Sequence, residues 1–235
     1  MIAVRPDRVL TSTFLQESLV EALRSRGVSV CHTDPRTLAN VLESFVTNAN
    51  ALGIPALGNE LQMRVMSELK QRAPPGVPLG FSSKIRRGAP SAEHRPLKVY
   101  AEEWHAPPMA SGNWVPDLIA LAGGESFLPS GERSRVVALE EVAAFDPDVI
   151  VLNYCGMSNV SATAQTELLR TRVGWNTLRA VRARRIAPVD DSLLNRPGPR
   201  LSRGMEQIAH AITAVRANTH ADTLLSQSSE SPATR

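Results

Sequence analysis

Aromatic and polar side chains gather where the predicted strands of this sequence end. Trp104 and His105 close a strand-like stretch that begins at Leu97, and Trp114 stands where the next helix should begin. Tryptophan offers a large flat apolar surface, so both rings can stack on a flat ligand or can fill a core. The imidazole of His105 can coordinate a metal atom of a ligand, although a loop histidine more often hydrogen-bonds the backbone. Both alternatives are open for each residue.

Polar residues follow the later strands in the same way. Tyr154 comes shortly after the strand that ends at Leu152, and Asn195 and Arg196 follow the last predicted strand. Arginine binds carboxylate or phosphate groups with paired hydrogen bonds; for Arg196 a helix cap or an ion pair with Asp190 or Asp191 is the alternative. Ligands of α/β proteins bind at the carboxyl ends of parallel strands. The predicted ligand-binding set is therefore Phe14 (after the first strand), Trp104, His105, Trp114, Tyr154, Asn195 and Arg196.

The elements that must hold these residues alternate between strand and helix in the second half of the chain. The spacing of apolar residues predicts strands over 97–104, 148–152 and 185–189 and helices over 114–122, 139–145, 161–170, 175–182 and 201–215. The stretch 148–152 is almost continuously apolar, as buried parallel strands are. Strands alternating with helices predict an α/β fold with parallel sheets.

The first half of the chain shows one strand–helix–strand unit, with strands near 8–11 and 28–30. A helix capped by Asp34 should follow, with Pro35 at its first position, and then a second helix over 59–72. Five prolines within 73–96 predict a long irregular connection. We expect an incomplete first α/β lobe over 1–50, a bridging helix and linker over 51–96, a second α/β lobe over 97–216, and a disordered tail over 217–235.

Composition and motifs exclude several classes of function. The basic clusters 84–87 and 182–185 lack interleaved aromatic residues or a recognisable module, so we expect no nucleic-acid binding. Cys31 and Cys155 give no metal-ligand spacing, and we expect neither a metal site nor a cofactor. No nucleophile elbow, H-E-x-x-H sequence or paired-carboxylate pattern occurs, so we expect no enzyme and no catalytic residues.

Five stretches, in this order, carry a resemblance to a known family. They are residues 5–10 (RPDRVL), 102–124 (EEWHAPP, GNWVPDLI and LAGG), 139–152 (LEEV and DPDVIVL), 175–182 (WNTLRAVR) and 189–200 (VD and NRPGPR). The pattern resembles the substrate-binding proteins of bacterial ABC importers for vitamin B12 and iron chelates. The resemblance covers most of residues 2–216.

The resemblance implies two Rossmann-like lobes bridged by a helix, with cobalamin or a related corrinoid held between them. An iron siderophore or haem is the alternative ligand. Glu140 matches the family's glutamate that docks onto the membrane subunits of the transporter, with Glu141 as the fallback, and the expected state is a monomer.

The resemblance also implies a periplasmic location. A true start at Met1, where no signal peptide is seen, would instead place the chain in the cytoplasm and favour a regulatory or interaction protein derived from this fold. Two departures from the family pattern imply weaker ligand binding: its opening strand and helix have no counterpart before residue 5, and prolines at 74, 75 and 78 end the bridging helix early.

Overall fold

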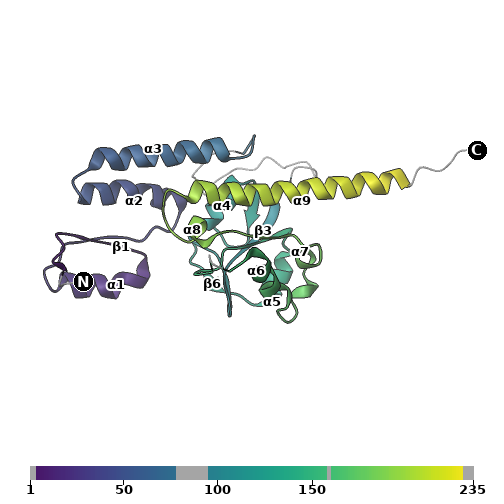
Figure 1. Cartoon of the computed structure of the whole chain (residues 1–235), viewed down its shortest axis with the longest axis horizontal. Coiled ribbons are helices and arrows are strands. Elements are labelled where there is room, and N and C mark those ends of the chain that lie inside the picture. Colours follow the sequence, from purple (N-terminus) through teal and green to yellow (C-terminus); the bar gives the residue numbers. More distant parts are fainter. Residues whose placement is uncertain (1–3, 78–94, 158–159, 230–235) are drawn as a thin grey trace, which may run out of the picture.

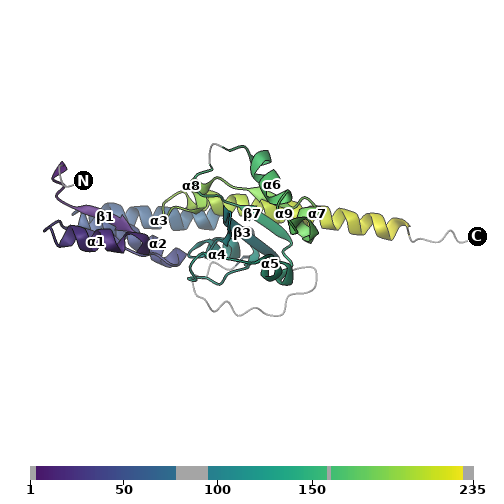
Figure 2. The same cartoon turned by 90° about the horizontal axis from the view of Figure 1, so that it is seen from below.

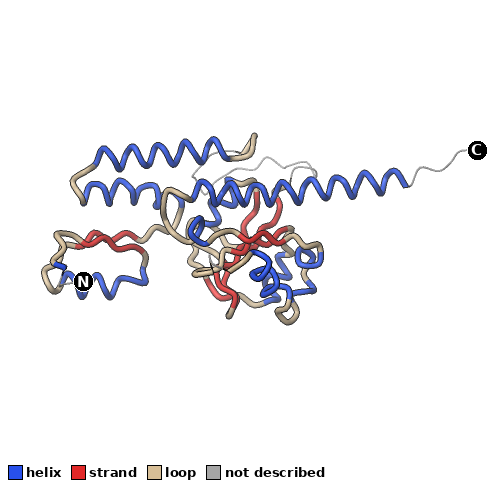
Figure 3. The backbone as a smooth tube through the Cα atoms, viewed as in Figure 1, coloured by secondary structure: helices blue, strands red, loops and turns tan. Residues whose placement is uncertain are grey.

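The computed structural model describes residues 4–77, 95–157 and 160–229, with side chains up to residue 218 (Figure 1). Its described strands form two separate sheets. In the first lobe the parallel strands β1 (Val9–Ser12) and β2 (Val30–Thr33) are joined by the helix α1 (Glu17–Arg24). The second lobe contains a six-stranded sheet, so strands gather in two places along the molecule (Figure 3). The predicted α/β class, with parallel strands and flanking helices, is confirmed.

The six-stranded sheet is built around β3 (Leu97–His105). The strand order is β6 (Arg135–Val136), β4 (Pro108–Ala110), β3, β7 (Val149–Leu152), β8 (Ile186–Pro188), and β5 (Gly124–Ser126) pairs with the first residues of β3. β3 is parallel to β5 and β7, and β7 is parallel to β8, whereas β4 and β6 run antiparallel. The carboxyl ends of β3, β7 and β8 therefore lie at one edge of the sheet.

Helices cover both faces of this sheet. The described helices of the second lobe are α4 (Val115–Leu121), α5 (Leu139–Phe145), α6 (Ala162–Arg170), a 3₁₀ turn at Trp175–Thr177, α7 (Arg179–Arg182), α8 (Asp191–Leu194) and α9 (Leu201–Ser229). Alternate residues of a strand point to opposite faces. Val99 and Val149 accordingly pack into a core with α4 and α9, whereas Tyr100 and Ile150 pack into a second core with α5, α6 and α7.

The helical hairpin of α2 (Leu38–Ala51) and α3 (Pro55–Arg72) shares the first of these cores. Phe45 of α2 and Leu69 of α3 are buried in the same cluster as Leu118 of α4. Gly58 lets the two helices approach, because a Cβ atom there would lie 2.5 Å from the Cβ of Ala49. We expected α2 in the first lobe, but its buried residues belong to the core of the second. In Figure 1 the end of α3 lies next to the start of α9, where Arg72 pairs with Glu206.

Other boundaries also differ from expectation. Thr37, not Asp34, caps α2, since its side chain accepts the N–H of Asn40. α9 continues to Ser229 and extends past the second lobe (Figures 1 and 2). We expected disorder after residue 216, but the chain is helical as far as Ser229. Most of the predicted linker, residues 78–94, lies outside the described residues. Within the described residues no helix is both long and apolar enough to cross a membrane.

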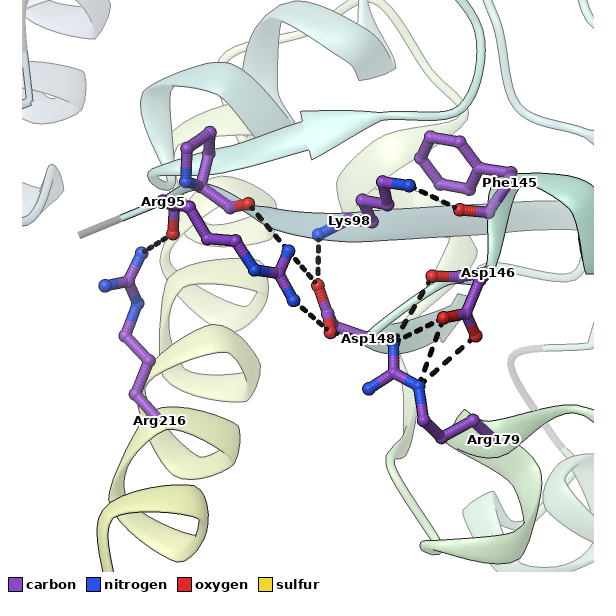
Figure 4. A network of polar contacts seen from close by, with 8 residues as sticks. Arg95, Lys98, Phe145, Asp146, Asp148, Arg179 and Arg216 are labelled. Carbon is purple, nitrogen blue, oxygen red and sulfur yellow. Dashed lines mark hydrogen bonds and ion pairs between the residues drawn. The ribbon is translucent and has the colours of Figure 1, made fainter. Parts of the chain in front are cut away.

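The chain enters the second lobe through a network of charged groups at the amino end of β3 and β7 (Figure 4). Asp148, whose side chain is 3% exposed, accepts two hydrogen bonds of 2.9 Å from Arg95 and one of 3.0 Å from Arg179. The backbone N–H of Lys98 donates a further bond of 2.8 Å. Burial by itself raises the pKa of Asp148, but these donors outweigh it and lower the pKa. Arg216 of α9 donates to the carbonyl of Arg95, which ties the entering chain to the last helix.

A second buried carboxylate lies further along β3. Glu102 is 0% exposed and accepts two hydrogen bonds from Arg172, at 2.7 and 2.9 Å. The hydroxyl groups of Tyr100 and Tyr154 donate to the same carboxylate at 2.8 and 2.7 Å. The guanidinium of Arg172 also lies 4.3 Å from the ring centroid of Trp175. A buried ion of this kind is stable only with its full set of donors.

We predict that Arg172→Met lowers the free energy of unfolding by about 3–5 kcal/mol, because the Glu102 carboxylate loses its counter-charge in the core. Urea unfolding measures the loss. Arg170→Met is the matched control: Arg170 pairs with Glu167 at the surface, and such pairs contribute about 0–1 kcal/mol. The double variant Glu102→Gln, Arg172→Met should lose less than the sum of the single variants; strict additivity would contradict the coupling.

Candidate functional site

The carboxyl edge of the large sheet brings together polar residues from three strand ends. Asn153 and Cys155 follow β7, and Asn195 ends the short helix after β8. The amide of Asn195 donates to the carbonyl of Asn153 at 2.6 Å and to the sulfur of Cys155 at 3.0 Å. The amide of Asn153 donates back to the side-chain oxygen of Asn195 at 2.5 Å. The predicted site residue Asn195 therefore lies at this edge, held by residues that the sequence did not single out.

Glu103 of β3 faces the same group. Burial raises its pKa to about 7, against a smaller opposite effect from a hydrogen bond with Ser134. Burial also raises the pKa of the Cys155 thiol, and the negative charge of Glu103 adds to that increase. Asp191, 6% exposed, accepts the backbone N–H of Gly156 at 3.0 Å. The edge thus presents amides, a thiol that stays protonated, and a carboxyl group that changes charge near neutral pH.

Trp104 and His105 lie at the end of β3 as expected. Trp104 is 43% exposed, and its indole N–H donates to the carbonyl of Ala106 at 3.0 Å. Its ring lies 6.2 Å from that of His105, which lies 5.6 Å from the ring of Tyr154. The Nδ1 atom of His105 is buried and has no hydrogen-bond partner among the described residues. As an alternative to metal coordination we considered a hydrogen bond from the His105 ring to the backbone. Among the described residues, Nδ1 makes no such bond.

Trp114 and Tyr154 are placed differently from the prediction. Trp114 is 4% exposed within the core of α4 and α9, and its indole N–H donates to the carbonyl of Leu194 at 2.7 Å. Tyr154 is 1% exposed, and its hydroxyl is committed to Glu102. The structure therefore buries both rings, Trp114 at the start of α4 and Tyr154 shortly after β7, where we expected surfaces open to a ligand. A ligand contact by either ring stays a prediction.

The remaining predicted residues lie on the surface. Phe14 is 37% exposed, and the guanidinium carbon of Arg133 lies 3.7 Å from its ring centroid. Arg196 is exposed and makes no hydrogen bond or ion pair with another described residue, including Asp190 and Asp191. Glu140 is likewise exposed and without a described partner. The sequence did not predict three residues of this site. Arg133 and Ser134 lie in a loop, which carries no periodic signal. Glu103 differs from its neighbour Glu102 only in the face of the strand from which its side chain projects.

We predict that Glu103 makes stability depend on pH. Its pKa is raised from the ordinary 4.5 to about 7, so between these values the folded protein keeps a proton that the unfolded chain has released. The free energy of unfolding should therefore fall by on the order of 2 kcal/mol from pH 5 to 8, relative to Glu103→Gln. Urea titrations at several pH values measure the difference. Glu132→Gln, at an exposed carboxylate, is the control, and parallel pH profiles for the parent and Glu103→Gln would refute the assignment.

Comparison with known proteins supports the sequence resemblance. No protein-family model matches the chain. The chain is 36% identical over 216 residues to an uncharacterized ABC transporter substrate-binding lipoprotein, YvrC, of Bacillus subtilis, covering 90% of this chain and 63% of that protein. The chain thus spans somewhat less than two thirds of that relative's length.

Solved structures resemble the fold over most of the chain. The periplasmic heme-binding protein RhuT of Roseiflexus sp. RS-1 is 23% identical, with a TM-score of 0.69, over 92% of this chain and 78% of that one. The periplasmic vitamin B12 binding protein BtuF of Vibrio cholerae is 17% identical, with a TM-score of 0.60, over 92% and 77%. The chain therefore has the fold of the periplasmic solute-binding proteins of ABC importers.

Proposed function

We propose that this protein is the substrate-binding component of an ABC importer and binds a corrinoid, such as cobalamin, between its two lobes. The observation that carries the proposal is the half-exposed indole of Trp104 next to His105, at the carboxyl edge of a sheet with this fold. A flat macrocycle stacks well on such a ring. The Nδ1 atom of His105 has no hydrogen-bond partner among the described residues. After a change of side-chain rotamer, the His105 imidazole can therefore coordinate the metal of a bound ligand.

The first lobe approaches the second on the same side. Ser134, whose side chain opposes the rise in the pKa of Glu103, follows Arg133, which contacts Phe14 of the first lobe. Phe14 and the carboxyl edge are thus linked through two consecutive residues. A ligand bound at this edge would have the first lobe as its opposite wall.

The polar groups of the edge favour a ligand rich in amides. Asn153 and Asn195 offer both donors and acceptors, and Glu103, whose pKa burial raises to about 7, is largely protonated below neutral pH. A corrin ring carries amide side chains, which pair with such groups. The phosphate of cobalamin suits the exposed guanidinium of Arg196, which has no partner among the described residues.

Haem or an iron siderophore is the second candidate ligand. Haem has the same flat shape and a metal that accepts imidazole, and the chain resembles RhuT somewhat more than BtuF in TM-score. A regulatory or interaction protein with this fold is the alternative of another class. It would bind none of these ligands.

We predict that Trp104→Ala weakens binding of cyanocobalamin by roughly 10–100-fold, because a stacked aromatic ring of this size is lost. Isothermal titration with cyanocobalamin, haem and a ferric hydroxamate, each against the parent and the variant, measures the change. Leu57→Ala is the control, since Leu57 is 57% exposed on α3. Equal affinity of parent and variant would reject Trp104 as the ligand platform, and saturable binding of haem or the hydroxamate alone would replace the corrinoid.

We further predict that Glu140→Ala lowers the ATPase activity that the loaded protein stimulates in a cognate transporter, while ligand affinity is unchanged. Glu140 is exposed and has no partner within the described part of the chain, whereas Glu141 binds Arg135 at 2.8 Å and the N–H of Ala138 at 3.0 Å. Glu141→Ala is the control and should retain stimulation. The reverse pattern would assign docking to Glu141.

A further inference from the structure

A short loop of the second lobe contacts the first lobe through two residues. The guanidinium carbon of Arg133 lies 3.7 Å from the centroid of the Phe14 ring, and one of its nitrogens lies 3.6 Å from the carboxylate of Asp34. Asp34 also accepts the backbone N–H of Phe14 at 3.1 Å. In the other direction, Arg36 donates to the carbonyl of Gly131 at 3.1 Å. Arg133 thus contacts the first lobe, and Arg36, in the connection between β2 and α2, binds the same loop of the second lobe.

The loop is rigidly seated in its own lobe. A Cβ atom on Gly112 would lie 2.3 Å from the carbonyl oxygen of Glu132 and 2.6 Å from the carbonyl carbon of Arg133. The N–H of Asn113 donates to Glu132 at 2.6 Å, and the N–H of Gly131 donates to Asn113 at 3.2 Å. Only a glycine at 112 lets the two backbones lie so close. Arg133 is thus presented from a fixed base.

The first lobe is equally constrained next to Phe14. Thr13 has φ 72° and ψ 150°, a conformation that a β-branched residue rarely adopts. Its N–H donates to the carbonyl of Thr33 at 2.9 Å, and its carbonyl accepts the N–H of Gln16 at 3.1 Å. Backbone strain of this kind persists only where the surroundings fix it, and it often marks functional positions. Here the constrained backbone of Thr13 fixes the position of the Cα atom of Phe14, from which the ring projects.

We propose that Arg133 is a positioning residue, which sets the separation of the two lobes by stacking on Phe14 and pairing with Asp34. Because both sides are fixed before they meet, little side-chain and loop freedom is lost when the contact forms. The clamp itself does not depend on a ligand. Its effect on ligand affinity rests on the proposed function, since the ligand is taken to lie between the lobes.

The test measures the distance between the lobes in the ligand-free protein. Spin labels at Glu21→Cys on α1 and Ala144→Cys on α5, both exposed positions, are placed in a Cys31→Ser, Cys155→Ser background. We expect a single narrow distance distribution that broadens or shifts in Arg133→Ala. Arg170→Ala, which removes an ion pair within the second lobe, should leave the distribution unchanged.

Two further variants separate the clamp from a general loss of structure. Arg133→Lys keeps the charge but loses the planar stack, so its distribution should lie between those of the parent and Arg133→Ala. Gly112→Ala should displace the loop and shift the distance while Arg133 is intact; if it fails to fold, the Arg133 variants still decide. A folded Arg133→Ala protein with the parent's distribution would overturn the proposal.

Ligand titration then tests what the clamp does for binding. Arg133→Ala should weaken cyanocobalamin or haem binding about tenfold at an unchanged melting temperature. If the parent binds neither ligand, the proposed function is wrong. The distances between the spin labels in the ligand-free protein then still test whether Arg133 sets the separation of the lobes. If the distances change and the affinity does not, the clamp stands and its role in binding is overturned.

Discussion

A carboxylate cannot remain charged inside a sheet without matched donors, and Glu102 imposes that constraint on the second lobe. Arg172 and two tyrosine hydroxyls satisfy it, and Tyr154 is thereby drawn into the core. The backbone beyond β7 then continues the ladder along β3, with the N–H of Asn153 bonded to Glu102 and that of Cys155 bonded to Glu103. The buried ion pair therefore fixes the turn from which Asn153 and Cys155 project into the candidate site.

The opposite end of the same strands is held by the same kind of interaction. Asp148 collects Arg95, Arg179 and the N–H of Lys98, which join the entering chain to α7 and β3. Such buried charges contribute little net stability compared with apolar packing, but they allow very few alternative arrangements. With one carboxylate at each end, the relative positions of β3 and β7 are fixed, and so is the edge where they finish.

The sequence predicts regular elements well and their partners poorly. The helix over 139–145 matches α5, and the strand over 148–152 contains β7, because a nearly continuous apolar run after a short helix is typical of a buried parallel strand. The strands β4, β5 and β6 have three residues or fewer and no periodicity of their own. The apolar stripe of α2 shows that the helix is buried, but not in which core.

The candidate site divides along the same line. Trp104, His105 and Asn195 lie at one edge of the sheet, as we predicted, because the carboxyl ends of parallel strands lie at the same edge. Position at a strand end could not distinguish an outward ring from an inward one, so the sequence did not predict that Trp114 and Tyr154 are buried. Arg172 gave no signal, because its partner is 70 positions away in the sequence.

Strand alternation also explains the chemistry of the site. Glu102 and Glu103 are neighbours that face opposite sides of β3, and their surroundings differ accordingly. Glu102 is paired with Arg172, whereas Glu103 has no such ion pair among the described residues, and burial raises the pKa of Glu103 to about 7. Below that pH its carboxyl group can donate a hydrogen bond, and above it the group only accepts. A group bound at the proposed site, beside two asparagines and a protonated thiol, would therefore meet a hydrogen-bond donor at Glu103 below pH 7 and a negative charge above it.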